Sequence, residues 1–290
     1  MPELPDIDLY VEKLDERIRG QILKDIRVSK PFLIRSFDPP LTTANGRRVV
    51  AIRRVGKRIV FGLEADYWLI LHLMIAGRLR WHDAAASIGG RNTLAAFDFD
   101  NGCLTLTEAG SQKRASLYLV HGERALAAHD PGGLEPLECS FEEFCARMLE
   151  ENRTLKRALT SPKTISGIGN AYSDEILHAA RLSPIKLTSR LSEEEMRRLF
   201  AAVRNTLEHW RNLLREQSRD RFPEKVTAFR DDMAVHGKFG KACPSCGTRV
   251  ARIRYKSSET NYCPGCQTGG RLLADRSLSR LLKDGWPDSL

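Results

Sequence analysis

Long apolar runs are missing from this 290-residue sequence, which excludes membrane-spanning helices. The longest run, residues 68–76, contains His72 and is far shorter than a bilayer requires. A secretion signal is not expected either, because the first ten residues include three acidic side chains and no apolar stretch. Internal repeats and low-complexity segments are also absent from the sequence. We therefore expect a cytoplasmic protein that does not bind membranes.

Negative charge is in deficit as well. The chain has 46 lysine and arginine residues against 37 aspartate and glutamate residues, a formal net charge of +9 and a pI near 9.3. This balance favours a polyanionic partner over an acidic small molecule, although many basic proteins bind no anion. A composition of 42% hydrophobic and 29% charged residues is typical of a globular protein, and the length favours two domains over one.

Cysteine is sparse outside one group. Cys103, Cys139 and Cys145 are isolated, and we interpret them as buried or half-buried thiols. The other four form two C-x-x-C pairs separated by sixteen residues: Cys243, Cys246, Cys263 and Cys266. This spacing predicts one structural Zn²⁺ held by four thiolates, which leave no open position for a catalytic water. Two disulfides are the alternative, which the lack of a secretion signal disfavours.

The segment between the two cysteine pairs alternates as a β-hairpin does, and a hairpin this small needs the metal to hold it. Its basic residues and two lysines just ahead of it predict contact with phosphates or entry into a groove. These residues are Arg249, Arg252, Arg254, Lys256, Lys238 and Lys241. A solvated charged surface is the alternative.

Hydrophobic periodicity changes along the chain. A helix with one apolar stripe is predicted over residues 4–20. From residue 22 to about 120, short β-branched runs predict an antiparallel sandwich or barrel, and Asp100-Asn101-Gly102 indicates a hairpin. A loop near residues 130–133 predicts the domain linker. Helices are predicted to follow over residues 141–159, 170–181 and 192–215, and Ser-x-x-Glu capping boxes open the first and the last of them.

The residues that follow Met1 carry unusual chemistry. Removal of Met1 leaves Pro2 with a free secondary amine that is partly unprotonated at neutral pH. Such an amine attacks an aldehyde-like carbon to form an iminium ion, and Glu3 stands beside it as a proton donor or acceptor. The alternative is a Pro-x-x-Pro opening that only stiffens the terminus ahead of the helix.

A glycine-rich turn at residues 164–170, which ends in Gly169 and Asn170, leads directly into a predicted helix. The exposed amides of a helix N-terminus suit a phosphate. No strand precedes the turn, so a dinucleotide-binding motif is excluded by its context. The pattern predicts a helix, two turns and a second helix.

Together these segments resemble the formamidopyrimidine-DNA glycosylase/endonuclease VIII family of base-excision repair enzymes, and the resemblance runs from Pro2 to Gln267. Four motifs occur in the family's order. Residues 2–5 are similar to its N-terminal signature, and Lys57 matches its basic residue on a hairpin turn. Residues 167–175 resemble its helix-two-turn-helix motif, and the four cysteines match its zinc finger.

The resemblance implies a bifunctional DNA glycosylase and AP lyase that removes oxidised bases from DNA. Pro2 is then the nucleophile toward C1′ of a nucleotide flipped from the duplex, and Glu3 transfers protons. Lys57 is implied as a third catalytic residue that holds a phosphate beside the lesion. The DNA-binding residues that the resemblance implies are Lys57, His72, Lys156, Gly169, Asn170, Arg254 and Lys256. The expected partner is damaged double-stranded DNA, bound by a monomer.

The implied fold class is a multidomain α+β architecture. It has an N-terminal catalytic β-sandwich domain with an N-terminal helix (1–132), then a helical helix-two-turn-helix domain (133–235). A β-hairpin zinc finger (236–268) and a C-terminal extension (269–290) follow. Leucines of the extension are expected to form one face of a short helix that packs back on the body.

Several positions depart from the family's pattern. Ser258 stands where the finger usually has a phosphate-binding arginine, with Arg254 and Lys256 as candidate replacements. Ile75 aligns with the methionine that fills the void left by the flipped base, and residues 107–114 and 217–235 are atypical. The choice between oxidised purines and oxidised pyrimidines therefore stays open. A non-catalytic reader of damaged or abasic DNA on the same scaffold is the alternative function, and an RNA-binding zinc-ribbon protein is a third.

Overall fold

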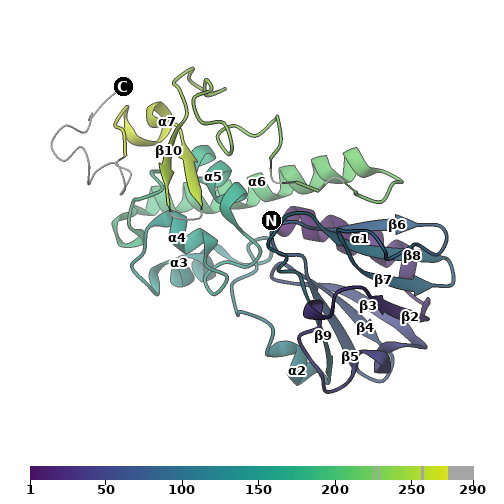
Figure 1. The fold of residues 1–290 in the computed structure, drawn as a ribbon. Coiled ribbons are helices and arrows are strands. Elements are labelled where there is room, and N and C mark those ends of the chain that lie inside the picture. Colours follow the sequence, from purple (N-terminus) through teal and green to yellow (C-terminus); the bar gives the residue numbers. More distant parts are fainter. Residues whose placement is uncertain (225, 228, 256–257, 274–290) are drawn as a thin grey trace. The chain divides into compact units, whose positions relative to one another are not determined.

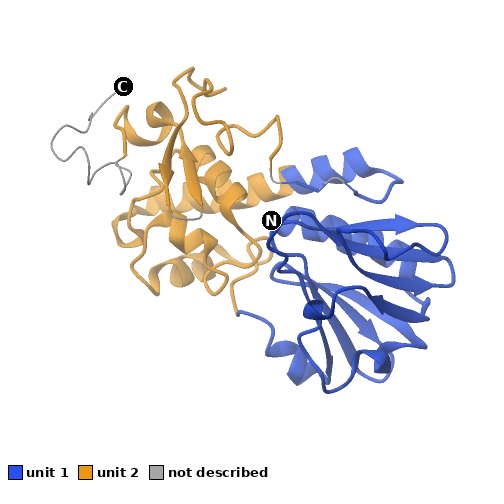
Figure 2. Cartoon of the chain, viewed as in Figure 1, with its two compact units in different colours: residues 1–131, 210–228 blue, residues 132–209, 229–290 orange. Residues whose placement is uncertain are grey.

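A computed structural model describes residues 1–224, 226–227, 229–255 and 258–273 (Figure 1). The chain forms two compact units, the first of residues 1–131 and 210–228 and the second of residues 132–209 and 229–290 (Figure 2). The long helix α6 (Glu193–Ser218) contributes residues to both units. The domain boundaries expected from the sequence at 132/133, 235/236 and 268/269 stay predictions.

Unit 1 is built on two antiparallel sheets (Figure 1). In the first, the strand order is β1 (Ile22–Leu23), β3 (Arg47–Val55), β4 (Arg58–Leu63), β5 (Tyr67–His72) and β9 (Ser116–His121). In the second it is β2 (Asp25–Val28), β7 (Thr93–Phe99), β8 (Gly102–Glu108) and β6 (Gly77–His82). Phe61 of β4 stacks on Phe97 of β7 with ring centroids 6.1 Å apart, so the two inner faces share one core. The predicted β-sandwich is confirmed.

The N-terminal helix α1 (Leu4–Ile18) covers part of this core. Its apolar stripe, Ile7, Tyr10, Leu14 and Ile18, is fully buried, and the helix packs against β3 and β4. Unit 1 also contains α2 (Glu123–Ala127) and two short 3-10 helices, Pro31–Leu33 and Leu41–Ala44. The stripe predicted from periodicity is therefore the contact face of the helix.

Unit 2 contains α3 (Phe141–Leu149), α4 (Leu155–Thr160), α5 (Asn170–Ala179), the 3-10 helix Thr188–Arg190 and the first part of α6. Both predicted capping boxes are present, and in each the serine hydroxyl accepts from the amide of the glutamate three residues later. The single helix predicted over residues 141–159 is wrong, because α3 ends at Leu149 and α4 begins at Leu155.

The physical reason for this break is a pairing between distant backbone segments. Thr188 donates its amide hydrogen to the carbonyl of Arg153, and Leu155 donates to the carbonyl of Lys186, each at 2.8 Å. These bonds engage the backbone on both sides of Thr154, which is extended (φ −64°, ψ 146°), so the helical ladder is interrupted there and resumes at Leu155. The first helix of the helix-two-turn-helix motif is consequently the six-residue α4.

The C-terminal part of unit 2 is the predicted hairpin, β10 (Ala251–Arg254) and β11 (Glu259–Tyr262), followed by α7 (Pro264–Thr268). Leu273 is buried beside Ile253 and Tyr262, and its amide donates to the Tyr262 hydroxyl at 2.7 Å. The rest of the predicted leucine-rich helix, residues 274–290, lies outside the described residues. Within the part of the chain that is described, no helix combines the length and apolarity needed to cross a bilayer.

Candidate active site and nucleic-acid interface

The start of α1 holds the two residues that the sequence assigns to catalysis. Pro2 and Glu3 are both buried, and Glu3 is the N-cap residue of α1. Glu3 donates its amide hydrogen to Oδ2 of Asp6 at 2.9 Å, while the Glu3 side chain accepts from the Asp6 amide. This reciprocal pair fixes the Glu3 carboxylate at the positive end of the helix dipole, next to Pro2.

The charges of four side chains in unit 1 act on the N-terminal amine. Burial lowers the pKa of the Met1 amine; Glu3 and Asp6 raise this pKa, whereas Arg78 and Lys57 lower it. Arg78 was not among the residues predicted from the sequence. It stands at the second position of β6, and nothing in the local pattern distinguishes it from Arg80 on the same strand. The fold therefore adds a second cation to the one expected at the terminus.

Lys57 lies on the predicted hairpin turn, between β3 and β4. Gly56 ahead of it adopts a left-handed conformation with φ of +59°, which a glycine reaches without steric cost. Arg54 donates to the Gly56 carbonyl at 3.1 Å and thereby closes the turn from inside. The position of Lys57 is thus set by a specific turn rather than by a loose loop.

His72 ends β5, and its ring has a defined protonation state. Its Nδ1 accepts a hydrogen bond from the amide of Met74 at 2.9 Å. Burial lowers the pKa of His72 to about 4, and the charges of Arg58 and Lys57 lower it in the same direction. The ring is therefore neutral at physiological pH and carries its proton on Nε2, where it is a hydrogen-bond donor.

The glycine-rich turn ends where predicted, with Gly169 as the N-cap of α5 and Asn170 as its first residue. Asn170 is half-buried, and its Nδ2 donates to the carbonyl of Glu259 on β11 at 2.9 Å. The β10–β11 hairpin therefore holds the Asn170 side chain at the N-terminus of α5.

Helix α5 also anchors the segment that leads into the first cysteine pair. The two carboxylate oxygens of Glu175 accept hydrogen bonds from the amides of Ala234, Val235 and His236 at 2.8–2.9 Å. The hairpin and the helix-two-turn-helix motif consequently belong to one compact unit.

Lys156 lies inside unit 2. Only 8% of the residue is exposed, and Nζ lies 2.5 Å from Oδ1 of Asp174 and 2.8 Å from the carbonyl of Asn170. The other Asp174 oxygen accepts from the amide of Asn261 at 3.2 Å and lies 2.8 Å from Nδ1 of His236. The ammonium thus links α4 to the first turn of α5. A DNA contact by Lys156 stays a prediction, and the buried ion pair gives this lysine a structural task.

Replacement of Lys156 by methionine is expected to destabilise the protein by about 3–5 kcal/mol, because it leaves the Asp174 carboxylate buried without its cation. Urea unfolding followed by circular dichroism measures the loss. Lys163→Met, on an exposed residue of the following turn, is the matched control and should change stability by less than about 0.5 kcal/mol. A comparably small change for Lys156→Met would contradict the structural assignment.

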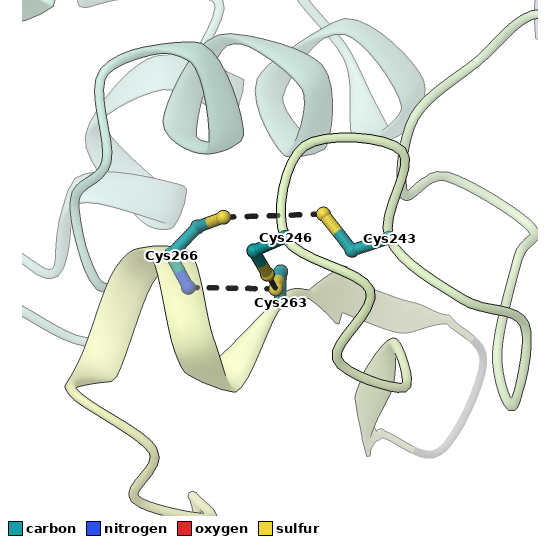
Figure 3. A group of neighbouring side chains, drawn as sticks. All are labelled: Cys243, Cys246, Cys263 and Cys266. Carbon is teal, nitrogen blue, oxygen red and sulfur yellow. Dashed lines mark hydrogen bonds between the residues drawn. The ribbon is translucent and has the colours of Figure 1, made fainter.

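The four cysteines converge at the end of the hairpin (Figure 3). All four sulfurs lie within 4.8 Å of one another, with 3.9 Å between Cys243 and Cys266 and 3.3 Å between Cys246 and Cys263. Tetrahedral zinc with Zn–S bonds of about 2.3 Å places its ligands about 3.8 Å apart, so these residues fit the metal.

Neighbouring groups also suit a thiolate cluster. His178 Nε2 lies 3.3 Å from the Cys243 sulfur, and the amide of Cys266 donates to the Cys263 sulfur at 3.4 Å. Burial raises the pKa of Cys263 to about 11, and it also raises the pKa of Cys266. Buried thiolates are therefore unfavourable without a counter-charge, and bound zinc supplies that charge. The cluster is a structural metal site with a complete ligand set.

The remaining predicted contacts lie on the hairpin. Arg254 is exposed at the end of β10, where it pairs in register with Glu259. Ser258 is exposed too, and its carbonyl accepts the amide of Tyr255 at 2.8 Å, which closes the hairpin turn. Lys256 lies outside the described residues.

A β-sandwich unit with a proline beside a glutamate, together with a helix-two-turn-helix unit that carries a four-cysteine hairpin, defines a class of DNA-processing proteins. Comparison with known proteins identifies the family. The model of the formamidopyrimidine-DNA glycosylase N-terminal domain matches residues 1–113, and that of the family's helix-two-turn-helix domain matches residues 133–215.

Relatives match along nearly the whole chain. The formamidopyrimidine-DNA glycosylase of Pelotomaculum thermopropionicum is 31% identical over 92% of this chain and 99% of its own length. A Lactococcus lactis Fpg mutant in complex with Fapy-dG-containing DNA has a TM-score of 0.81 at 26% identity and covers 92% of this chain. All of that Lactococcus chain is matched. The wild-type Lactococcus protein with DNA containing an oxidised pyrimidine has a TM-score of 0.80 at 25% identity, with the same coverage of both chains. The chain therefore belongs to the formamidopyrimidine-DNA glycosylase family, which confirms the resemblance seen in the sequence.

Proposed function

We propose that this chain is a base-excision repair DNA glycosylase with AP-lyase activity that removes oxidised bases from duplex DNA through a Schiff base on the nitrogen of Pro2. The observation that carries the proposal is the N-terminus itself: Pro2 is buried beside Glu3, and Lys57 and Arg78 act on the terminal amine. Family membership supports the same activity. The enzyme acts as a monomer in the cytoplasm, on nucleoid DNA.

The terminal amine has to be unprotonated when it attacks. Burial and nearby positive charge both favour the neutral form of an amine. These influences act on the Met1 amine, and the Pro2 nitrogen, one residue further along, takes their place when Met1 is removed. The same surroundings thus favour a nucleophilic proline at neutral pH.

The reaction divides into balanced steps. The Pro2 nitrogen forms a bond to C1′ while the glycosidic bond breaks, and the base leaves with the electron pair of that bond and takes up the proton that the Pro2 nitrogen loses. Glu3 protonates the ring oxygen, the sugar ring opens and C1′ becomes an iminium carbon. Loss of a C2′ proton into this electron sink expels the 3′ phosphate, and a second elimination expels the 5′ phosphate. Water then releases the sugar fragment from Pro2.

The structural zinc supplies no chemistry to these steps, because four thiolates fill its coordination sphere. DNA binding is assigned to hydrogen-bond donors and cations of each unit. In unit 1 they are the Lys57 ammonium and Nε2 of His72. In unit 2 they are the N-terminal amides of α5 and the second Nδ2 hydrogen of Asn170. Such contacts hold phosphates and do not select a base.

Borohydride trapping tests the proposal. Duplex DNA with an abasic site or an oxidised base, incubated with the enzyme and borohydride, is expected to yield a covalent adduct whose DNA fragment maps to the N-terminal peptide. Tight binding to an abasic-site analogue without adduct would favour the non-catalytic reader instead. A panel of 8-oxoguanine, formamidopyrimidines, thymine glycol and hydantoins then assigns the substrate class by relative excision rates.

A further inference from the structure

Two adjacent arginines of β3 have different surroundings. Successive residues of a strand point to opposite faces, so Arg53 and Arg54 face different sides of the sheet. The Arg53 side chain is 47% exposed, and its Nη1 lies 2.9 Å from Oε1 of Glu123. Its Cζ lies 4.3 Å from the centroid of the Trp68 ring, in a cation–π contact. The Arg54 side chain is only 14% exposed. A buried arginine needs hydrogen-bond acceptors for its guanidinium. Those of Arg54 lie in α1, which begins after Glu3, and in the turn that carries Lys57.

The Arg54 guanidinium donates in two directions. Its Nε donates to Oδ1 of Asp8 in α1 at 2.7 Å, and its Nη1 donates to the carbonyl of Gly56 at 3.1 Å. Asp8 lies in the same helix as the Glu3 cap, and Gly56 immediately precedes Lys57. One side chain therefore ties the helix that begins at the active site to the turn that carries the lysine.

The pair depends on this geometry. The Asp8 side chain is 17% exposed, and burial raises its pKa while Arg54 lowers it. Arg211 is a second cation near Asp8, with 3.9 Å between Nη1 and Oδ2, and Arg215 also interacts electrostatically with Asp8. A guanidinium has donors fixed in a plane, whereas a lysine ammonium is a point charge and does not reproduce the fork that spans both acceptors.

We propose that Arg54 is a positioning residue of the reaction, which sets the place of the Lys57 ammonium beside the Pro2 nitrogen by holding the Gly56 carbonyl and the Asp8 carboxylate together. This inference rests on the proposed function. Gly56 and Lys57 form the tip of the two-residue turn and lie outside the strand ladder of β3 and β4. A displacement of about 1 Å at a reacting group costs on the order of 10²-fold in rate, so the bond to Gly56 is expected to matter for catalysis more than for folding.

A double-mutant cycle tests this placement. The variants are Arg54→Lys, Lys57→Ala and the double variant, with Arg53→Lys as the matched control on the opposite face. The readouts are the single-turnover rate of borohydride-trapped adduct formation, the Kd for an abasic-site analogue and the Tm. Arg54→Lys is expected to slow adduct formation by on the order of 10²-fold. Its Tm should stay close to that of the parent and its Kd should rise far less than the rate falls, since Lys57 is one of several groups assigned to phosphate binding. Arg53→Lys should change none of the three.

The cycle separates positioning from general destabilisation. If Arg54 acts through Lys57, Arg54→Lys slows the Lys57→Ala variant by no more than about 2-fold, because contacting residues are not additive. If Arg54→Lys slows adduct formation as much in the Lys57→Ala variant as it does in the parent chain, the proposal is overturned. Asp8→Asn, which weakens the other bond of Arg54, is expected to reproduce the rate loss, and a parental rate would also count against it.

Failure of the proposed function has a different signature. If the unmodified chain forms no adduct, the glycosylase/lyase assignment fails. If the adduct forms and Lys57→Ala leaves its rate unchanged, the positioning role of Arg54 fails while the Pro2 chemistry stands.

Discussion

A chain with an uncleaved tag ahead of Pro2 is expected to form no borohydride-trapped adduct with abasic-site DNA. In such a chain the Pro2 nitrogen is an amide, which has neither a hydrogen to lose nor a nucleophilic lone pair. Strand cleavage should fall by on the order of 10³-fold or more, as it does when a covalent nucleophile is removed from other enzymes. The effect is large because Pro2 is assigned both the bond to C1′ and the electron sink.

The matched control is the same protein before and after proteolysis of the tag. A protease that leaves Pro2 as the first residue should restore adduct formation and cleavage together. The Kd for an abasic-site analogue, measured before and after, shows whether the tag obstructs DNA. Full activity of the tagged chain with unchanged binding would identify another residue as the nucleophile.

Removal of zinc is the second change with a large expected effect. Apparent zinc affinities of small finger domains correspond to about 10–16 kcal/mol, so the hairpin is not expected to keep its structure without the metal. When the hairpin loses its structure, Asn170 loses its hydrogen bond to the carbonyl of Glu259, and Asp174 loses its hydrogen bond from the amide of Asn261. DNA affinity should fall by about 10²-fold or more, since each charge-assisted hydrogen bond to a phosphate contributes about 1.5–3 kcal/mol.

Chelation followed by elemental analysis and fluorescence anisotropy measures this effect. The loaded protein should contain one zinc per chain, and added zinc should restore binding to the chelated protein. Unit 1 contains none of the four cysteines, so its thermal transition is expected to persist after metal removal. Unchanged DNA affinity in fully metal-free protein would show that the hairpin holds its structure without the metal.

Elements defined by local chemistry were predictable from the sequence. The helix after Pro2 has an apolar stripe and its own cap, and each strand of the sandwich is a short β-branched run between turn residues. The four cysteines needed only their spacing to indicate a metal site. Each of these patterns lies within one continuous segment of the chain, so periodicity, propensity and spacing decide the outcome.

Long-range pairing decided what the sequence pattern missed. The helix predicted over residues 141–159 is divided because residues 153–155 bond to residues 186–188. Lys156 resembles a surface lysine in sequence, yet Asp174, eighteen residues later, holds it inside unit 2. Arg78 has no local feature that separates it from Arg80, and only the fold brings it near the terminal amine.

The sequence by itself determined which groups are capable of the chemistry: a secondary amine behind Met1, a carboxylate beside it, a lysine after Gly56 and four thiolates in two pairs. Tertiary structure alone decided their protonation and their supports. Burial and neighbouring charge make His72 neutral and lower the pKa of the terminal amine, and a hydrogen bond to the carbonyl of Glu259 holds Asn170 in place. Both effects depend on the distance between residues far apart in the chain, and that distance is a property of the folded molecule.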